Sequence, residues 1–144
     1  MEKIGKKILN LEALEQIVLQ KDEISIDADA AAEVAASHSF LKNFAKDKLI
    51  YGINTGFGPM AQYRIEDEDA RQLQLNLIRS HSSGMGTLLT PDQSRALMLA
   101  RLNTLLRAYS GVHPELIELM TALINAEAYP CVYQHGGVGA SGDL

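Results

Sequence analysis

Apolar side chains recur every three or four residues along much of this chain, the spacing that places them on one face of an α-helix. Val34 and Leu41, for instance, share such a face, and Asp27 or Asp29 before them can accept hydrogen bonds from the unpaired amides of a first helical turn. The pattern predicts helices over about residues 11–19, 27–44, 66–78, 90–109 and 113–124.

The helix that begins near residue 90 has the clearest boundary signals. Thr90 can cap its first turn, Pro91 fits the first helical position, and Gln93 stands where the reciprocal partner of a capping box belongs. We expect this helix to reach Tyr109 and to be terminated by Gly111.

Two short stretches alternate in the manner of strands, and two others are rich in glycine. Ile24–Ile26 and Leu49–Tyr51 predict brief strands, whereas Tyr51–Gly58 and Gly136–Gly142 interrupt regular structure. A loop that costs this much ordering entropy usually has a functional reason. Since no repeat or linker separates these parts, the predicted fold class is mainly α with a few short β-strands, in one unit.

Composition narrows the class of protein. The chain has 144 residues, about one ordinary domain, of which 47% are apolar and 22% charged, as in soluble globular proteins. Its net charge of −5 disfavours nucleic acid and anionic membranes as partners, because both recruit an excess of Lys and Arg. No run approaches the roughly 18 apolar residues of a membrane span, and no signal core follows Met1, so we expect a cytoplasmic protein. The lone Cys131 cannot form an internal disulfide and is expected to be a small apolar filler.

Gly137, Gly139 and Gly142 together spell the G-x-G-x-x-G pattern of a dinucleotide-binding loop. A β-prone run, Tyr129–Tyr133, precedes them, but the helix and acidic residue that should follow are missing, and no Lys stands where a P-loop requires one. A dinucleotide-binding module therefore stays open as an alternative. A metal site is not indicated, because Cys131 and His135 form a single pair where structural zinc needs four ligands.

Four motifs stand in order along the chain: Tyr51–Gly58, Asn76–Gly84, Arg101–Leu106 with Ser110–Val112, and Gly139–Leu144. Together they resemble the motifs of the aromatic amino-acid ammonia-lyases and aminomutases. Members of that family are several times longer, so the resemblance implies that residues 1–144 form the N-terminal, cofactor-bearing domain of a longer lyase. It also implies that this domain is the N-terminal part of the all-α, aspartase/fumarase-like fold of the family.

The resemblance further implies an electrophile made from three consecutive residues. The amide nitrogen of Gly142 would attack the carbonyl carbon of Ala140, and Ser141 would lose its hydroxyl, which gives 4-methylidene-imidazol-5-one without metal, pyridoxal phosphate or NAD. A residue without Cβ at the attacking position eases such a ring closure. Asp143 would orient or protonate the departing oxygen. The usual family residue before Val138 is Ser, whereas this chain has Gly137, which should not block cyclisation.

Three further residues take roles by the same resemblance. Tyr51 would be the base that removes the β-proton of the substrate, with a structural tyrosine as the alternative. His81 would lie beside the aromatic side chain of the substrate, where its imidazole can pair with histidine or with the hydroxyl of tyrosine but not with phenylalanine. Asn103 is a weaker candidate for contact near the cofactor, since a polar residue on a helix face explains it nearly as well.

The resemblance implies elimination of ammonia from an aromatic amino acid. Histidine, giving urocanate, is the first choice because Ser80–His81 matches the histidine lyases; tyrosine, giving coumarate, and a 2,3-aminomutase are the alternatives. In the family the site is assembled from several subunits of a tetramer, so we expect a homo-oligomer and an inactive isolated segment. An inert helical interaction module is the remaining alternative.

Overall fold

The computed structural model describes residues 1–6 and 9–137, which form two compact units. Unit 1 comprises Met1–Leu41 and Leu88–Val132, and unit 2 comprises Lys42–Thr87 and the segment that starts at Tyr133. The sequence predicted one helical unit. The difference arises because every buried apolar side chain in the described residues belongs to unit 1, so the segment from Lys42 to Thr87 has no share in that core.

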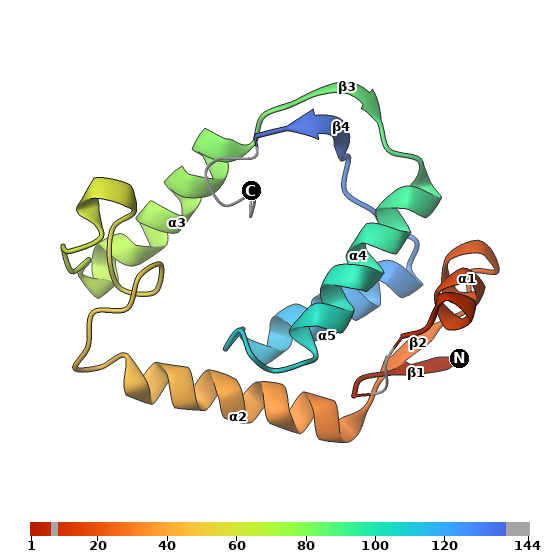
Figure 1. Cartoon of the computed structure of the whole chain (residues 1–144), viewed down its shortest axis with the longest axis horizontal. Coiled ribbons are helices and arrows are strands. Elements are labelled where there is room, and N and C mark those ends of the chain that lie inside the picture. Colours follow the sequence, from red (N-terminus) through yellow and green to blue (C-terminus); the bar gives the residue numbers. More distant parts are fainter. Residues whose placement is uncertain (7–8, 138–144) are drawn as a thin grey trace. The chain divides into compact units, whose positions relative to one another are not determined.

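Helices make up most of the described chain, with short strands between them, which confirms the predicted fold class. Figure 1 labels the elements in order: β1 (Glu2–Ile4), α1 (Leu11–Leu19), β2 (Ile24–Ile26), α2 (Ala28–Phe44), the 3₁₀ turn η1 (Gly58–Met60), α3 (Asp67–His81), β3 (Gly84–Leu88), α4 (Pro91–Leu105), α5 (Pro114–Asn125) and β4 (Tyr133–Gly136).

The helices begin where their sequence signals stand. α4 shows the predicted capping box: the Thr90 Oγ1 accepts from the Gln93 amide at 3.3 Å, and the Gln93 Oε1 accepts from the Thr90 amide at 2.8 Å. At the start of α2, the Asp27 carboxylate accepts from the amides of Asp29 and Ala30 at 3.0 and 3.3 Å. Short side-chain caps of this kind are local, which is why the sequence predicts them well.

Three local predictions were wrong. α4 ends at Leu105 and not at Tyr109, because the chain leaves the helix through a left-handed Ala108 with φ of 60°. No strand forms over Leu49–Tyr51; the amides of Ile53 and Asn54 donate to the Ile50 carbonyl and make a turn. Cys131 is exposed and fills no core position.

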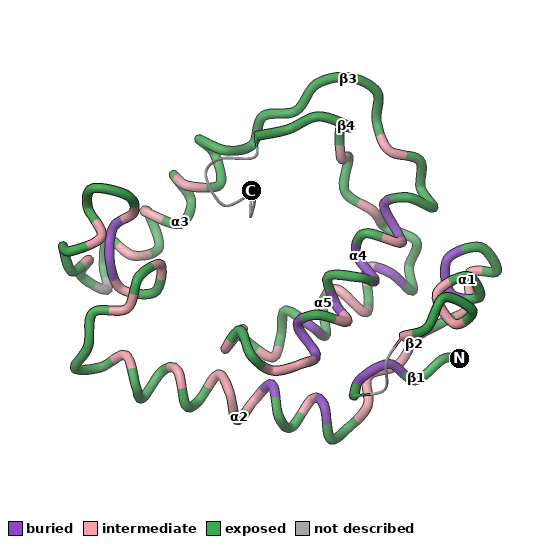
Figure 2. The backbone as a smooth tube through the Cα atoms, viewed as in Figure 1, coloured by how far each residue is buried: buried purple, intermediate pink, exposed green. Residues whose placement is uncertain are grey.

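The core of unit 1 lies between α1, α2, α4, α5 and the two-stranded sheet of β1 and β2 (Figure 2). These strands pair in parallel, with Glu2 opposite Ile24 and Ile4 opposite Ile26. The Asn125 side chain, at the end of α5, continues the ladder on β2: its amide group exchanges two hydrogen bonds of 2.9 Å with the backbone of Ile24. The buried apolar residues are Ile4, Ile17, Val18, Ile24, Ala30, Val34, Met98, Leu99, Leu102, Leu105, Leu106, Ile117 and Ile124.

Arg95 lies inside this core, only 1% exposed, and its sequence context gave no sign of that burial. Its guanidinium donates to the carbonyls of Ile17, Asp22 and Ile124 at 2.8, 2.9 and 2.6 Å, and to the Tyr129 hydroxyl at 3.0 Å. Two of these carbonyls lie near the C-terminal ends of α1 and α5, where a positive charge is favourable. Arg95 therefore links α1, α4 and α5 from within.

Candidate active site

The glycine-rich loop of unit 2 is ordered by one asparagine. The Asn54 side chain accepts from the Ile50 amide at 2.8 Å and donates to the carbonyls of Ala45 and Lys48 at 3.0 and 2.7 Å. Its own carbonyl accepts from the Ile65 amide at 3.0 Å. Asn54 thus links two separate stretches of backbone around the loop, residues 45–50 and Ile65, and its short amide side chain both donates and accepts there.

Thr55 and the glycines beside it complete the loop. Thr55 is 2% exposed; its hydroxyl donates to the Gly56 carbonyl at 2.9 Å, and its backbone makes an isolated bridge with Arg64. A Cβ on Gly56 would approach within 2.9 Å of the Met60 carbonyl oxygen, a backbone atom that cannot easily move aside. Gly52 has a φ of 76°. Glycine is required here by close approach and by a left-handed backbone.

Tyr51 stands at the start of this loop with 62% of its surface exposed. Its ring packs edge-on against Phe57, with centroids 5.9 Å apart, and its hydroxyl oxygen accepts a long hydrogen bond of 3.4 Å from the Gly58 amide. The phenol oxygen is therefore accessible and already faces a backbone donor. A negative charge that developed on this oxygen would be stabilised by that donor.

His81 is the last residue of α3, and its side chain is exposed. Its Nδ1 lies 2.9 Å from the Leu77 carbonyl oxygen and 2.9 Å from the Ser80 Oγ. With a proton on Nδ1, the ring would donate to the Leu77 carbonyl and Nε2 of the neutral ring would be an acceptor; with the proton on Nε2, Nδ1 would accept from the Ser80 hydroxyl. The helix end thus holds the ring through Nδ1 in either tautomer.

β3 and β4 form a two-stranded ribbon whose residues are all exposed. An open depression of about 270 Å³ lies against it, lined by Ser83, Gly84, Met85, His135, Gly136 and Gly137. The sequence gave no role to Ser83 and His135, because their proximity depends on a pairing between strands that are distant along the chain. β4 precedes residues 140–143 in the sequence, and those four predicted site residues, Ala140, Ser141, Gly142 and Asp143, lie outside the described residues.

Asn103 lies on α4 in unit 1, whereas Tyr51 and His81 belong to unit 2. Its Oδ1 is buried and has no hydrogen-bond partner within the described part of the chain. The side chain borders a cavity of about 190 Å³ beside β1 and α1, whose other lining residues include Leu9 and Asn10. A contact between Asn103 and the cofactor therefore stays a prediction.

A family model described as aromatic amino acid lyase matches residues 9–144. The chain belongs to this family. A histidine ammonia-lyase of Vibrio vulnificus is 40% identical to it over 137 residues, which cover 94% of this chain and 27% of that protein. The chain thus spans about a quarter of the length of the relatives it matches.

Two solved structures of aromatic amino-acid lyases and aminomutases share its fold. A tyrosine aminomutase from Streptomyces globisporus superposes with a TM-score of 0.87 at 30% identity, covering 96% of this chain and 26% of that one. A histidine ammonia-lyase from Trypanosoma cruzi gives a TM-score of 0.83 at 32% identity, covering 96% and 27%. The predicted family and fold are therefore confirmed.

The residue types at positions 140–142 fit the prosthetic group expected for the family. Gly142 has no Cβ beside the nitrogen that would attack, Ala140 is small, and Ser141 carries the hydroxyl that would leave. In the structure, the strand that leads to them is packed closely: a Cβ on Gly136 would lie 3.3 Å from the Ser83 carbonyl oxygen. The residue types present are thus those that such a condensation would require.

The two histidines of unit 1, His38 and His113, form hydrogen bonds with backbone groups. The His38 Nδ1 lies 3.1 Å from the Gly111 carbonyl oxygen, and the His113 Nδ1 accepts from the Glu115 amide at 3.3 Å as the cap of α5.

Within residues 1–6 and 9–137, no group of three or more His, Cys, Asp or Glu side chains is placed to hold a metal. Among the same residues, no helix combines the length and apolarity needed to cross a membrane.

Proposed function

We propose that the complete protein containing this chain is a histidine ammonia-lyase, which eliminates ammonia from L-histidine to give urocanate. The observation that carries this proposal is the 40% identity with a histidine ammonia-lyase over nearly the whole chain. His81 supports it, because with a proton on Nδ1 its Nε2 would accept a hydrogen bond from a substrate imidazole N–H. We further propose that residues 1–144 are the N-terminal, cofactor-bearing domain of that enzyme.

The prosthetic group would be built from Ala140, Ser141 and Gly142, with Asp143 in support, and it would supply an electrophile that activates the amino group for departure. This chain's own residues would do the rest. Tyr51 would accept the β-proton of the substrate on its accessible phenol oxygen, beside the Gly58 amide. His81 would hold the aromatic side chain and so fix the β-carbon relative to Tyr51.

Tyrosine is the second candidate substrate, and the similarity to a tyrosine aminomutase favours it. A phenol hydroxyl could donate to the same His81 Nε2 that an imidazole N–H would use, so this residue does not separate the two. A lyase and a 2,3-aminomutase would use the same residues and differ in whether ammonia re-adds before the product leaves.

Incubation of the complete protein with each amino acid separates these candidates. Urocanate from histidine is the expected product; coumarate from tyrosine, or a β-amino acid, would support the alternatives. Absence of all three products, with an intact mass that shows no loss of water, would reject the proposal. Binding of NAD in the micromolar range would instead favour a dinucleotide-binding module at Gly137, Gly139 and Gly142.

The assembly and location of the protein stay proposals as well. We expect a homotetramer with shared active sites in the cytoplasm and an isolated 144-residue segment that lacks activity, which would make this segment alone an inert helical module. Light scattering of the complete protein measures the assembly directly.

A further inference from the structure

Gly84 and Tyr133 are in very close contact across the β3–β4 ribbon. A Cβ added to Gly84 would lie 2.6 Å from the Tyr133 Cδ2 and 3.0 Å from both its Cβ and its Cγ. Close-packed side chains do not tolerate approaches below about 3 Å, so any larger residue at position 84 must displace Tyr133. The shortest approach is to the ring of Tyr133, which would have to turn aside, while the Cβ would have to give by a few tenths of an ångström and carry β4 with it.

The ribbon has no apolar core that could hold β4 in place after such a shift. All residues of β3 and β4 are exposed, and Met85 is 70% and Tyr133 47% exposed. Its geometry therefore depends on backbone pairing and on close approach across glycines. Gly86 also lies close to a side chain of β4: it has a φ of 88°, and a Cβ there would lie 3.0 Å from the His135 ring. Both glycines of β3 thus leave room for side chains of β4.

The position of β4 is important because the condensing residues come soon after it in the chain. β4 ends at Gly136, four residues before Ala140. In the proposed condensation, a bond forms between the Gly142 nitrogen and the Ala140 carbonyl carbon, and the carbonyl oxygen leaves as water with the hydrogens of the Gly142 and Ser141 amides. A second water takes the Ser141 hydroxyl and its α-hydrogen. Ring closure of this kind depends steeply on the alignment of the reacting atoms.

We propose that Gly84 is a positioning residue for formation of the prosthetic group: by admitting Tyr133 against the backbone of β3, it fixes the strand from which the condensing residues extend. This inference rests on the proposed function. It assigns to position 84 a role in making the cofactor, at a distance of 56 residues along the chain, and requires no contact between Gly84 and substrate.

The test compares G84A with G137A in the complete protein. Both change one glycine of the same depression to alanine, but the Cβ at position 137 would lie an ordinary 3.6 Å from the Ser83 Oγ, although Gly137 is much nearer to Ala140 in sequence. The measured quantity is the rate at which soluble, folded protein becomes lighter by two waters, followed by intact mass after a pulse of expression. We expect G84A to slow this loss roughly tenfold to a hundredfold, and G137A to leave it unchanged.

The double variant G84A/Y133A keeps the test decisive if G84A folds poorly. It removes the Tyr133 Cγ and Cδ2 that oppose the new methyl group, so dehydration should recover much of its rate. A normal rate in G84A, or equal slowing in G84A and G84A/Y133A, would overturn the positioning role while the proposed function stood. Wild-type protein that never loses two waters would overturn the proposed function itself.

Discussion

The two units of this chain are stabilised by different means. Unit 1 buries thirteen apolar side chains between its helices and its small parallel sheet. Among the described residues of unit 2, no apolar side chain is buried; Thr55 is its buried polar residue, and its loop is held by the hydrogen bonds of Asn54. The predicted base, Tyr51, and the predicted substrate contact, His81, both lie in unit 2.

This contrast separates a scaffold from a candidate site. Burial of apolar surface stabilises without regard to direction, whereas hydrogen bonds and close glycine contacts fix positions with little apolar burial. Unit 2 thereby keeps polar side chains accessible at defined positions. We therefore expect substitutions in unit 2 to alter activity with little effect on the stability of unit 1. Substitutions in unit 1 should lower stability with little direct effect on the chemistry.

The largest effect is expected at Tyr51. In the complete protein, Y51F should lower kcat by roughly 10²–10⁴-fold, because the group that accepts the β-proton is lost. Tyr63, in the same unit and 52% exposed, offers a matched control, and Y63F should retain activity. Rates of product formation and thermal unfolding midpoints measure both variants. Equal activity in wild type and Y51F would remove Tyr51 from the mechanism.

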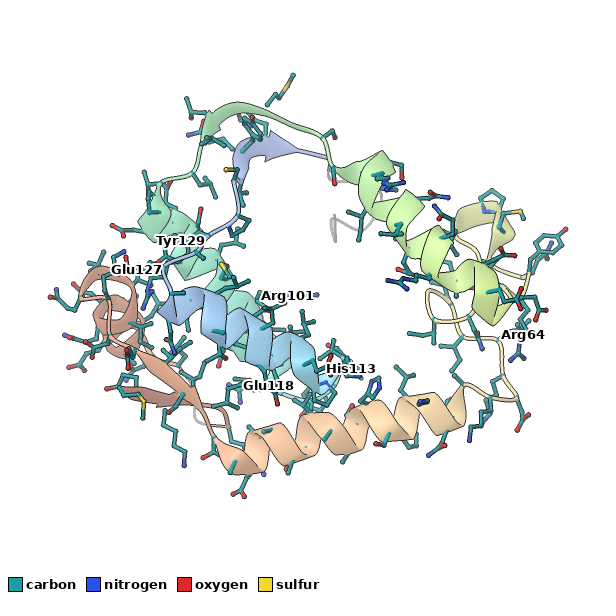
Figure 3. The ribbon with its side chains drawn as sticks, turned by 180° about the vertical axis from the view of Figure 1, so that it is seen from behind. Arg64, Arg101, His113, Glu118, Glu127 and Tyr129 are labelled. Carbon is teal, nitrogen blue, oxygen red and sulfur yellow. The ribbon has the colours of Figure 1, made fainter. Side chains whose placement is uncertain are left out.

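A substitution at the buried Arg95 tests how the core of unit 1 is stabilised. R95M should reduce the free energy of unfolding of unit 1 by about 3–5 kcal/mol, because three backbone carbonyls and the Tyr129 hydroxyl lose a buried donor. The exposed Arg101 lies on the same helix, and R101M is expected to change stability by less than about 0.5 kcal/mol (Figure 3). Denaturant titration followed by circular dichroism compares the two, and similar midpoints would contradict the buried role.

A substitution at Asn54 tests whether the loop of unit 2 opens independently of unit 1. N54A leaves the Ile50 amide and two carbonyls without their partner, at a cost of about 1–3 kcal/mol to the local stability of the loop. Hydrogen exchange should therefore quicken over residues 45–65 and stay unchanged in α4 and α5. N76A is the control, since Asn76 accepts one exposed hydrogen bond from Gln72. Faster exchange throughout unit 1 would show that the two units do not open separately.

The smallest effect concerns pH. The ion pair with Lys3, at 3.2 Å, and the amides of α2 hold the pKa of the half-buried Asp27 carboxyl below its usual value. Its contribution to stability is therefore present above the unfolded-state pKa and is lost as the pH falls through the lower, folded-state pKa. D27N should remove this dependence at acid pH, with a slight loss of stability near neutrality. Thermal unfolding between about pH 2 and pH 7 measures the difference, and identical profiles would contradict it.

The sequence predicted the features that depend on neighbouring residues. The Thr90–Gln93 capping box and the helix expected from about residue 113 follow from side chains within one helical turn, and the structure confirms both. The end of α4 was missed because Ala108 has no intrinsic preference for the left-handed conformation that it adopts. A turn forms over Leu49–Tyr51 in place of the predicted strand, because the Ile50 amide donates a hydrogen bond to the Asn54 side chain four residues later.

By itself, the sequence determined the family, the helical class and the set of residues suited to make an electrophile, because these are properties of residue type and order. Tertiary structure alone decided that Arg95 is buried among carbonyls from α1 and α5, and that Gly84 meets Tyr133 across a ribbon. Both depend on which distant segments of backbone come together. Which segments meet depends on many weak contacts that form together when the chain packs. The order of residue types along the chain does not specify those contacts one by one.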